Sequence, residues 1–98
     1  MAEDHFTIKE NSCVAKIAAW KLKASSVAIV FGNTIHLWNS SKEDFLKNER
    51  WLKHELCHIR QYKEQGYFGF IIKYLWESLY KGYYNNKFEV EAREAEDE

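Results

Sequence analysis

The chain has 98 residues, a length that supports one small domain and excludes a second domain within it. Its residues are 46% hydrophobic and 16% aromatic, which is ample for a folded core and excludes an intrinsically disordered chain. The formal net charge of −1 argues against nucleic acid as the main partner. We therefore expect residues 1–98 to form a single folded domain.

No targeting or membrane-spanning segment is recognisable in the sequence. The first residues are polar and acidic, and the longest apolar run, residues 67–75, is interrupted by Gly69 and Lys73. Cys13 and Cys57 are predicted to be buried, reduced thiols, because Cys57 stands within a helix that a disulfide would distort. These features predict a cytoplasmic protein that has no membrane partner.

The first half of the chain predicts a helix followed by a β-hairpin. Residues 11–23 place apolar side chains at the spacing of an amphipathic helix. Two β-branched apolar runs follow, residues 26–31 and 34–38, and they are joined by the pair Gly32-Asn33. Such a glycine-containing pair between two apolar runs is typical of a tight hairpin turn.

The second half predicts helices. Ser40 and Ser41 can cap a helix that runs to Gly66, with a break near Asn48. An aromatic helix over residues 67–81 ends at Gly82, and residues 83–86 form a loop. The last helix begins near Lys87 and frays into an acidic tail over residues 92–98. The order predicts an α+β fold, with a small antiparallel hairpin packed against the central helix and two further C-terminal helices.

The central helix contains the pattern HExxH, formed by His54, Glu55 and His58. Two histidines four residues apart lie about 40° apart around a helix axis, so both imidazoles can reach one metal ion. Zinc held in this way lowers the pKa of its water to about 7, and the intervening glutamate can take a proton from that water. The pattern predicts a zinc site with Glu55 as general base.

A third protein ligand is needed to complete such a site. Glu64 stands ten residues after His54, but Gln61 occupies the position where a glycine would turn the chain, so Glu64 is a poor candidate. Glu89 and Glu91 lie about thirty residues beyond His58, near the start of the last helix, where the helix dipole favours a carboxylate. We predict Glu89 as the third ligand, with Glu91 as the alternative.

These motifs resemble the gluzincin branch of the HExxH zinc metallopeptidases, and most closely its small bacterial zincin-like domains. The resemblance covers residues 26–92 and is carried by two patterns, His54-Glu55-x-x-His58-x-x-Gln61 and Asn86-x-Phe88-Glu89-x-x-Ala92.

The resemblance implies a minimal zincin-like fold and a role for each site residue. His54, His58 and Glu89 would bind Zn²⁺, and Glu55 would act as general base and later as proton donor. Tyr83 and Tyr84, in the loop before Glu89, are candidates for contacts to an oxyanion or substrate. Arg93 stands where the family often has a carboxylate or amide that supports a ligand histidine, which is a departure from the family pattern.

The first functional hypothesis is a metallopeptidase that acts on a peptide or protein substrate. An alternative from another class is a binding or scaffold module that keeps the metal but has little or no turnover. The small size leaves little chain for the far wall of a cleft, so a homodimer or a partner chain is a candidate for completing it. A weaker third hypothesis is a structural domain whose HExxH pattern is incidental.

Overall fold

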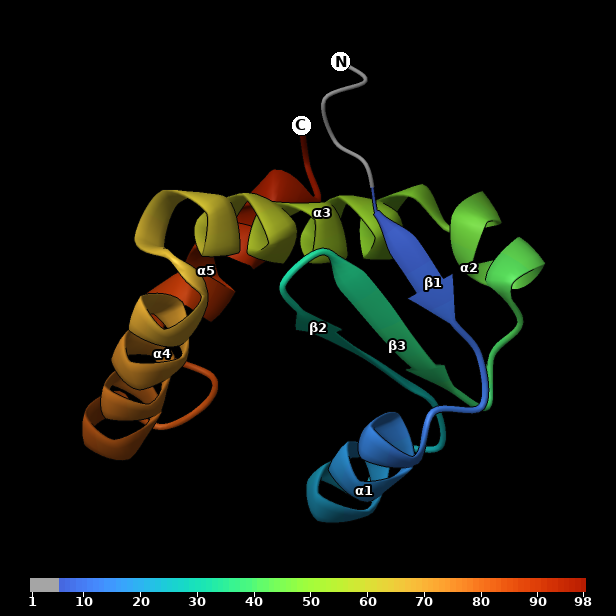
Figure 1. Cartoon of the computed structure of the whole chain (residues 1–98), viewed down its shortest axis with the longest axis horizontal. Helices are drawn as coiled ribbons and strands as arrows, with labels where there is room; N and C mark the ends of the chain where they lie inside the picture. Colours follow the sequence, from blue (N-terminus) through green and yellow to red (C-terminus); the bar gives the residue numbers. More distant parts are fainter. Residues whose placement is uncertain (1–5) are drawn as a thin grey trace.

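A computed structural model describes residues 6–98 of the chain, and its elements confirm the α+β class. Figure 1 shows a small sheet with helices beside it. In chain order the elements are β1 (Thr7–Lys9), α1 (Cys13–Leu22), β2 (Val27–Phe31), β3 (Thr34–Trp38), α2 (Lys42–Lys47), α3 (Glu49–Gln65), α4 (Tyr67–Lys81) and α5 (Lys87–Ala95).

The sheet contains the predicted hairpin and one strand that the sequence does not predict. β2 and β3 pair in antiparallel register, and Gly32 in their turn has a φ of 64°, which glycine adopts without a Cβ penalty. β1 pairs with β3 in parallel, so the strand order is β1-β3-β2 and the sheet is mixed. β2 is consequently an edge strand, with one side free of strand pairing.

Local capping interactions set the ends of the central helices as predicted. The Ser41 hydroxyl accepts a hydrogen bond from the Asp44 amide and begins α2. The chain leaves helical geometry at Asn48, whose side chain then accepts from the Trp51 amide and begins α3. The predicted break at Asn48 is therefore a second N-cap, and it starts α3 six residues before His54.

The core lies between the sheet, α3 and α4, with one side chain each from α2 and α5. Its buried side chains are Val30, Ile35, Leu37, Phe45, Ile59, Tyr62, Phe70 and Phe88. Burying these large apolar groups is the main source of stability in such a domain. The packing fixes α3 against the sheet and brings α5 alongside α3.

The C-terminal segment differs from the frayed tail expected over residues 92–98. α5 continues to Ala95, and Ala92 and Ala95 are buried against Cys57 of α3. The small alanine side chains let the two helices approach closely. The end of α5 is therefore part of the packed structure.

The exposure of the two cysteines and the character of the helices can be compared with the predictions from the sequence. Cys57 is buried and free as predicted, whereas Cys13 is exposed at the start of α1, so the prediction of a buried thiol there is wrong. None of the helices formed by residues 6–98 has both the length and the apolar character that a membrane span requires.

Candidate metal centre

Three side chains from two helices converge on one point in the structure. His54 and His58 lie one turn apart on α3, and their rings meet edge to face with centroids 5.0 Å apart. Glu89, in the first turn of α5, reaches between them: its Oε1 lies 3.1 Å from His54 Nε2 and its Oε2 lies 3.2 Å from His58 Nε2. One ligand atom of each residue lies within 4.8 Å of the others. The structure thus brings together the three residues predicted as metal ligands.

The start of α5 is held in place by Asn86, which is fully buried. Its side-chain oxygen accepts from the Phe88 amide, and its amide group donates to the Tyr74 carbonyl and the Ser78 hydroxyl of α4. This cap ties the α4–α5 loop to α4, and it fixes where the first turn of α5 presents Glu89.

The alternative ligand, Glu91, is not brought to the histidine pair. Its carboxylate accepts from the Gln61 side-chain amide at 2.7 Å, and its side chain is 51% exposed. Glu64, the poor candidate, is also exposed and lies near Arg60 on the outer side of α3. The geometry therefore favours Glu89 over both.

Each histidine has its outer nitrogen occupied by an acceptor from the chain. Nδ1 of His54 lies 2.6 Å from Glu96 Oε2, and Nδ1 of His58 lies 2.8 Å from Gln61 Oε1. A proton held on Nδ1 leaves the Nε2 lone pair of a neutral imidazole for a metal ion. These supporting contacts therefore orient both rings as a metal site requires.

Glu96 was missed by the sequence reasoning because it stands in the segment expected to fray. The spacing of the two glutamates could have indicated its role. Glu96 follows Glu89 by seven residues, so both project from the same side of α5. Arg50 also contacts Glu96 at 3.2 Å. Gln61 was left without a definite role, and the structure has it orient His58 while its amide donates to the Phe88 carbonyl of α5.

The charges of the cluster are strongly coupled. Burial lowers the pKa of His54, but the hydrogen bond with Glu89 and the nearby carboxylates of Glu55 and Glu96 outweigh it and raise that pKa to about 9. The pKa of His58 is also raised, because the hydrogen bond and charge of Glu89 outweigh burial. Burial raises the pKa of Glu89, but hydrogen bonds from both histidines hold it well below its usual range. Without metal, the Glu89 carboxylate therefore bridges the two histidine rings.

Glu55 lies beside this cluster and is buried. Burial raises the pKa of its carboxyl group to about 7, although the charges of His58 and His54 act in the opposite direction. A carboxyl group with a pKa near neutrality can both accept and return a proton. Its position and its pKa suit the role of general base predicted from the sequence.

The tyrosines around the centre differ in their positions. Tyr83 lines the cavity beside the cluster, and burial together with the charge of Glu89 raises its pKa to about 12. Tyr84 is 69% exposed and places its ring over the Arg93 guanidinium at 4.0 Å, away from the cluster. Tyr74, which the sequence reasoning missed, donates to Glu89 Oε2 at 2.5 Å. Of the two predicted contact residues, only Tyr83 lies at the site.

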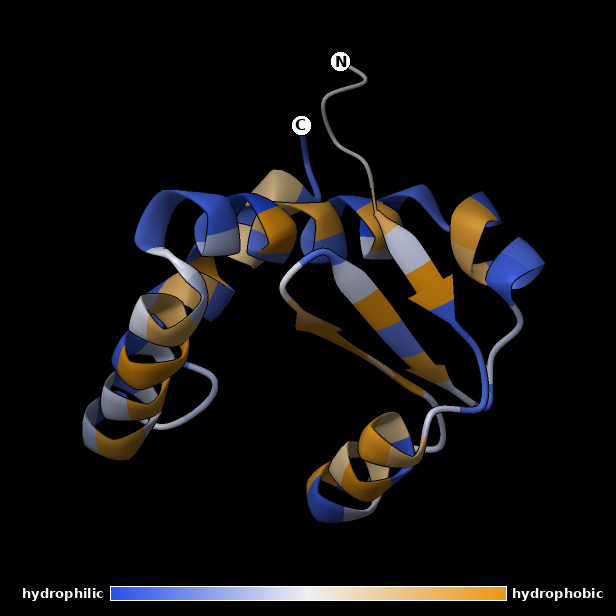
Figure 2. Cartoon of the chain, viewed as in Figure 1, coloured by the Kyte–Doolittle hydropathy of each residue, from blue (hydrophilic) through white to orange (hydrophobic). Residues whose placement is uncertain are grey.

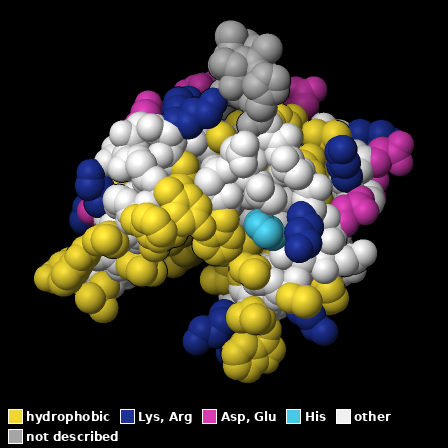
Figure 3. Space-filling model, in the orientation of Figure 1, with side chains coloured by type: hydrophobic (Ala, Val, Ile, Leu, Met, Phe, Trp, Pro, Cys, Tyr) yellow, Lys and Arg dark blue, Asp and Glu magenta, His cyan; other side chains and the backbone are white. Residues whose placement is uncertain are grey.

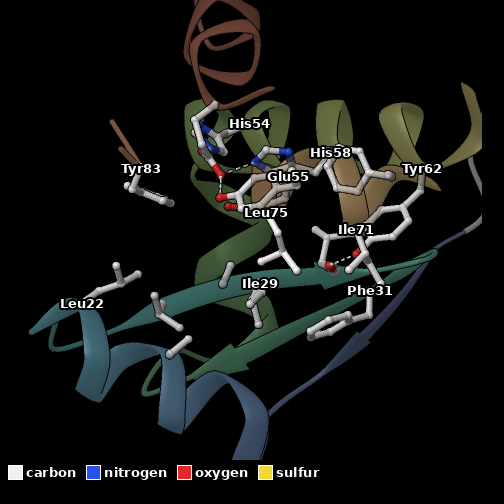
Figure 4. Close-up of a pocket in the computed structure, with 17 residues that line it drawn as sticks. Leu22, Ile29, Phe31, His54, Glu55, His58, Tyr62, Ile71, Leu75 and Tyr83 are labelled. Atoms are coloured by element: carbon white, nitrogen blue, oxygen red, sulfur yellow. Dashed lines mark hydrogen bonds and ion pairs between the residues drawn. The ribbon is translucent and has the colours of Figure 1, made fainter. Parts of the chain in front are cut away.

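A cavity of about 230 Å³ adjoins the cluster. β2 and α1 form one side and α4 forms the other, and Figure 4 shows the histidines above the strand. Its lining is mainly apolar, and the polar groups are gathered at the cluster. Such a combination is typical of a site that binds a ligand by apolar contacts and acts on it at one end.

The chemistry of the donor set fits zinc. Two imidazole nitrogens and one carboxylate oxygen are the ligands of many catalytic zinc sites, and they leave a fourth position open. Comparison of the chain with protein-family models, curated proteins and solved structures finds no match. The assignment of the centre depends on its own geometry.

We expect Glu96→Ala to weaken zinc affinity about 10- to 100-fold, because His54 loses the acceptor that orients its ring. Competition with a chromophoric zinc chelator measures the change. Glu94→Ala, on the same helix but exposed, is the matched control and should leave affinity unchanged. Equal affinities for the two variants would contradict the orienting role.

The metal-free chain is expected to lose stability as the pH rises from 7 to 9.5. His54 has a folded-state pKa of about 9 against an ordinary value of 6.5, so its stabilisation is present below pH 6.5 and disappears as the pH passes 9. The loss is on the order of 2 kcal/mol, or about 10 °C in Tm for a domain of this size. Thermal unfolding in the presence of a chelator measures it. His54→Gln should show a smaller decrease, and the part that remains is due to His58, whose pKa is also raised. The same pH dependence in both proteins would show that His54 is not the source.

Proposed function

We propose that the chain is a zinc-dependent metallopeptidase whose metal ligands are His54, His58 and Glu89. The observation that carries the proposal is the convergence of two Nε2 atoms and one carboxylate beside a buried Glu55, at the end of an apolar cavity. Bound zinc supplies a Lewis acid that polarises a carbonyl group and makes water more acidic.

Residues of the chain would carry out proton transfer, ligand positioning and oxyanion stabilisation. Glu55 takes a proton from the attacking water and returns it to the amine as the carbon–nitrogen bond breaks, and its pKa of about 7 suits both steps. Tyr74 holds Glu89 by its hydrogen bond. Tyr83, at the cavity, is positioned to donate to the oxyanion that develops on the carbonyl.

A peptide substrate is supported by the free edge of β2. All five residues of this strand, Val27–Phe31, line the cavity next to the metal cluster. An edge strand offers an extended peptide backbone groups that are not paired within the sheet, although the Val30 carbonyl of β2 already accepts a hydrogen bond from Tyr62. The neighbouring pocket can accept the side chains of the peptide. This arrangement would lay a peptide bond across the cluster.

One observation favours the alternative, a metal-bearing binding or scaffold module. The hydroxyl groups of two tyrosines that line the cavity already have partners within the chain. Tyr62 donates to the Val30 carbonyl, and Tyr74 donates to Glu89. Stabilisation of an oxyanion by a cavity tyrosine would therefore depend on Tyr83 alone, which is 48% exposed, so metal binding without turnover is the second candidate function.

The test combines zinc content with cleavage of an unstructured peptide library. The proposal expects about one equivalent of zinc, cleavage of the library, loss of cleavage on chelation and recovery when zinc is restored. Full zinc loading without cleavage would support the scaffold module. Less than about a tenth of an equivalent of zinc, unchanged in His54→Ala, would contradict both.

A further inference from the structure

Two helices expose an apolar surface that the metal centre does not use. In Figure 1, α1 and α4 project from the end of the molecule opposite to the C-terminus, and Figure 2 shows hydrophobic residues along both. We define the apolar face by six large side chains that are each more than half exposed: Ile17, Trp20, Phe68, Trp76, Leu79 and Tyr80.

Large exposed side chains of two helices form this surface. In Figure 3 the hydrophobic side chains gather over both helices, with a hollow between them. The six residues are not part of the cavity lining. To that lining α1 contributes Ala18 and Leu22, and α4 contributes Phe70, Ile71, Tyr74 and Leu75. Contiguous exposed apolar surfaces usually mark a contact with a protein or a membrane. The apolar face therefore needs a partner of its own.

The charges around the apolar face have one dominant sign. Residues 13–31 and 67–84 are the segments that contain α1, β2 and α4. These segments hold one carboxylate and five lysines, and each of the lysines is exposed: Lys16, Lys21, Lys23, Lys73 and Lys81. With Glu77 as the single acid, these segments carry a net charge of +4. The other residues that the structure describes, 6–12, 32–66 and 85–98, carry a net charge of −3. The segments that contain the apolar face are thus more basic than the rest of the described structure.

This charge distribution selects between partners. A second copy bound through the same face would bring a charge of +4 against another +4, which opposes the contact. The apolar face is complementary to a partner whose surface is negatively charged and whose interior, just below that surface, is apolar. Helices with lysine beside tryptophan, phenylalanine and leucine bind at the interface of anionic lipid bilayers, where each lysine near the surface contributes favourably.

We propose that the apolar face docks on the surface of a membrane that contains anionic lipid. The helices lie on the bilayer with Trp20, Phe68 and Trp76 among the headgroups, while Lys21 and Lys81 contact lipid phosphate and carboxylate groups. Docking of this kind needs no membrane-spanning helix. It differs from the sequence-based expectation of no membrane partner, which considered only spanning segments.

Docking would also place the cavity next to the lipid, because α1 and α4 form its two sides. The proposal does not depend on zinc or on turnover, since neither the six apolar residues nor the lysines belong to the metal centre. Membrane binding and peptidase activity can therefore fail or succeed separately.

The test is co-sedimentation of the full chain with vesicles. We expect binding to vesicles of phosphatidylcholine with about 30% phosphatidylserine, at least tenfold weaker binding to pure phosphatidylcholine, and weakening by salt. A blue shift of tryptophan fluorescence should accompany binding. Absence of binding to the anionic vesicles, or equal binding to both compositions, would overturn the proposal.

Matched variants locate the surface. Trp20→Ser and the double variant Lys21→Gln/Lys23→Gln should each reduce anionic-vesicle binding about tenfold or more, while circular dichroism shows an unchanged fold. Lys42→Gln/Lys47→Gln on α2 removes the same charge away from the apolar face and should bind like the parent chain. Equal loss in both lysine pairs would overturn the assigned surface. A dimer that Trp20→Ser dissociates, without vesicle binding, would show that a second copy occupies the face instead.

Discussion

Glu55→Gln is expected to reduce peptide hydrolysis by about 10²- to 10⁴-fold while zinc content stays at the level of the parent chain. A general base contributes a factor of this size, and glutamine cannot take a proton from water. The substitution keeps the shape of the side chain at a buried position, so the packing of α3 should be retained. Cleavage of the peptide library and zinc analysis of the same preparation measure the two effects.

The control for this experiment is Glu64→Gln, which removes a carboxylate from the same helix at an exposed position. It should leave both hydrolysis and zinc content unchanged. If Glu55→Gln cleaved peptides within about threefold of the parent chain, Glu55 would not be the general base. If it lost zinc, the carboxylate would instead be needed to hold the metal.

The local parts of the fold and site are readable from the sequence because short-range interactions set them. Asn48 and Ser41 cap helices through bonds that span three residues, and Gly32 supplies the turn conformation of the hairpin. The four-residue spacing of His54 and His58 fixes their relation on α3 before any tertiary contact forms. Such features need no knowledge of the neighbouring elements.

The contacts that were missed connect distant parts of the chain. β1 has only three residues, and it pairs with β3, twenty-seven positions away in the sequence. No local sequence pattern therefore predicts this strand. Glu96 meets His54 across forty-two residues, and Tyr74 meets Glu89 from another helix. Tyr83 and Tyr84 are adjacent in sequence, and only the path of the loop decides which of them reaches the cavity.

Glu89 was predictable for a different reason, since spacing and the helix start restricted the third ligand to two residues. The structure separates them by direction along α5: Glu89 projects toward the histidines and Glu91 toward Gln61. Residues two apart on a helix lie about 200° apart around its axis, so the two carboxylates cannot exchange roles without turning the helix. Zinc affinity of variants at the two positions can therefore distinguish Glu89 from Glu91 as the ligand.

Glu89→Ala is expected to weaken zinc affinity by at least about a hundredfold, whereas Glu91→Ala should change it by less than about threefold. Structural zinc sites in proteins bind with about 10–16 kcal/mol, so losing one of three protein ligands removes a substantial part of that free energy. Glu91 contacts the Gln61 side-chain amide and Arg60 rather than the histidines. Without Glu91, Gln61 keeps its bonds to His58 and the Phe88 carbonyl. Chelator competition on both variants measures the difference.

The two substitutions remove the same group from the same helix, so Glu91→Ala controls for the change in charge and helix propensity. Glu89→Ala also removes the acceptor of Tyr74, and circular dichroism must show that the helices remain. Glu89→Gln separates the two effects, because the amide oxygen can still accept from Tyr74 but carries no negative charge toward zinc. Affinity lost in Glu89→Ala and Glu89→Gln but kept in Glu91→Ala would identify the Glu89 carboxylate as the ligand. Loss in Glu91→Ala alone would move the metal to the other side of α5, away from Glu55, and would contradict the proposed chemistry as well.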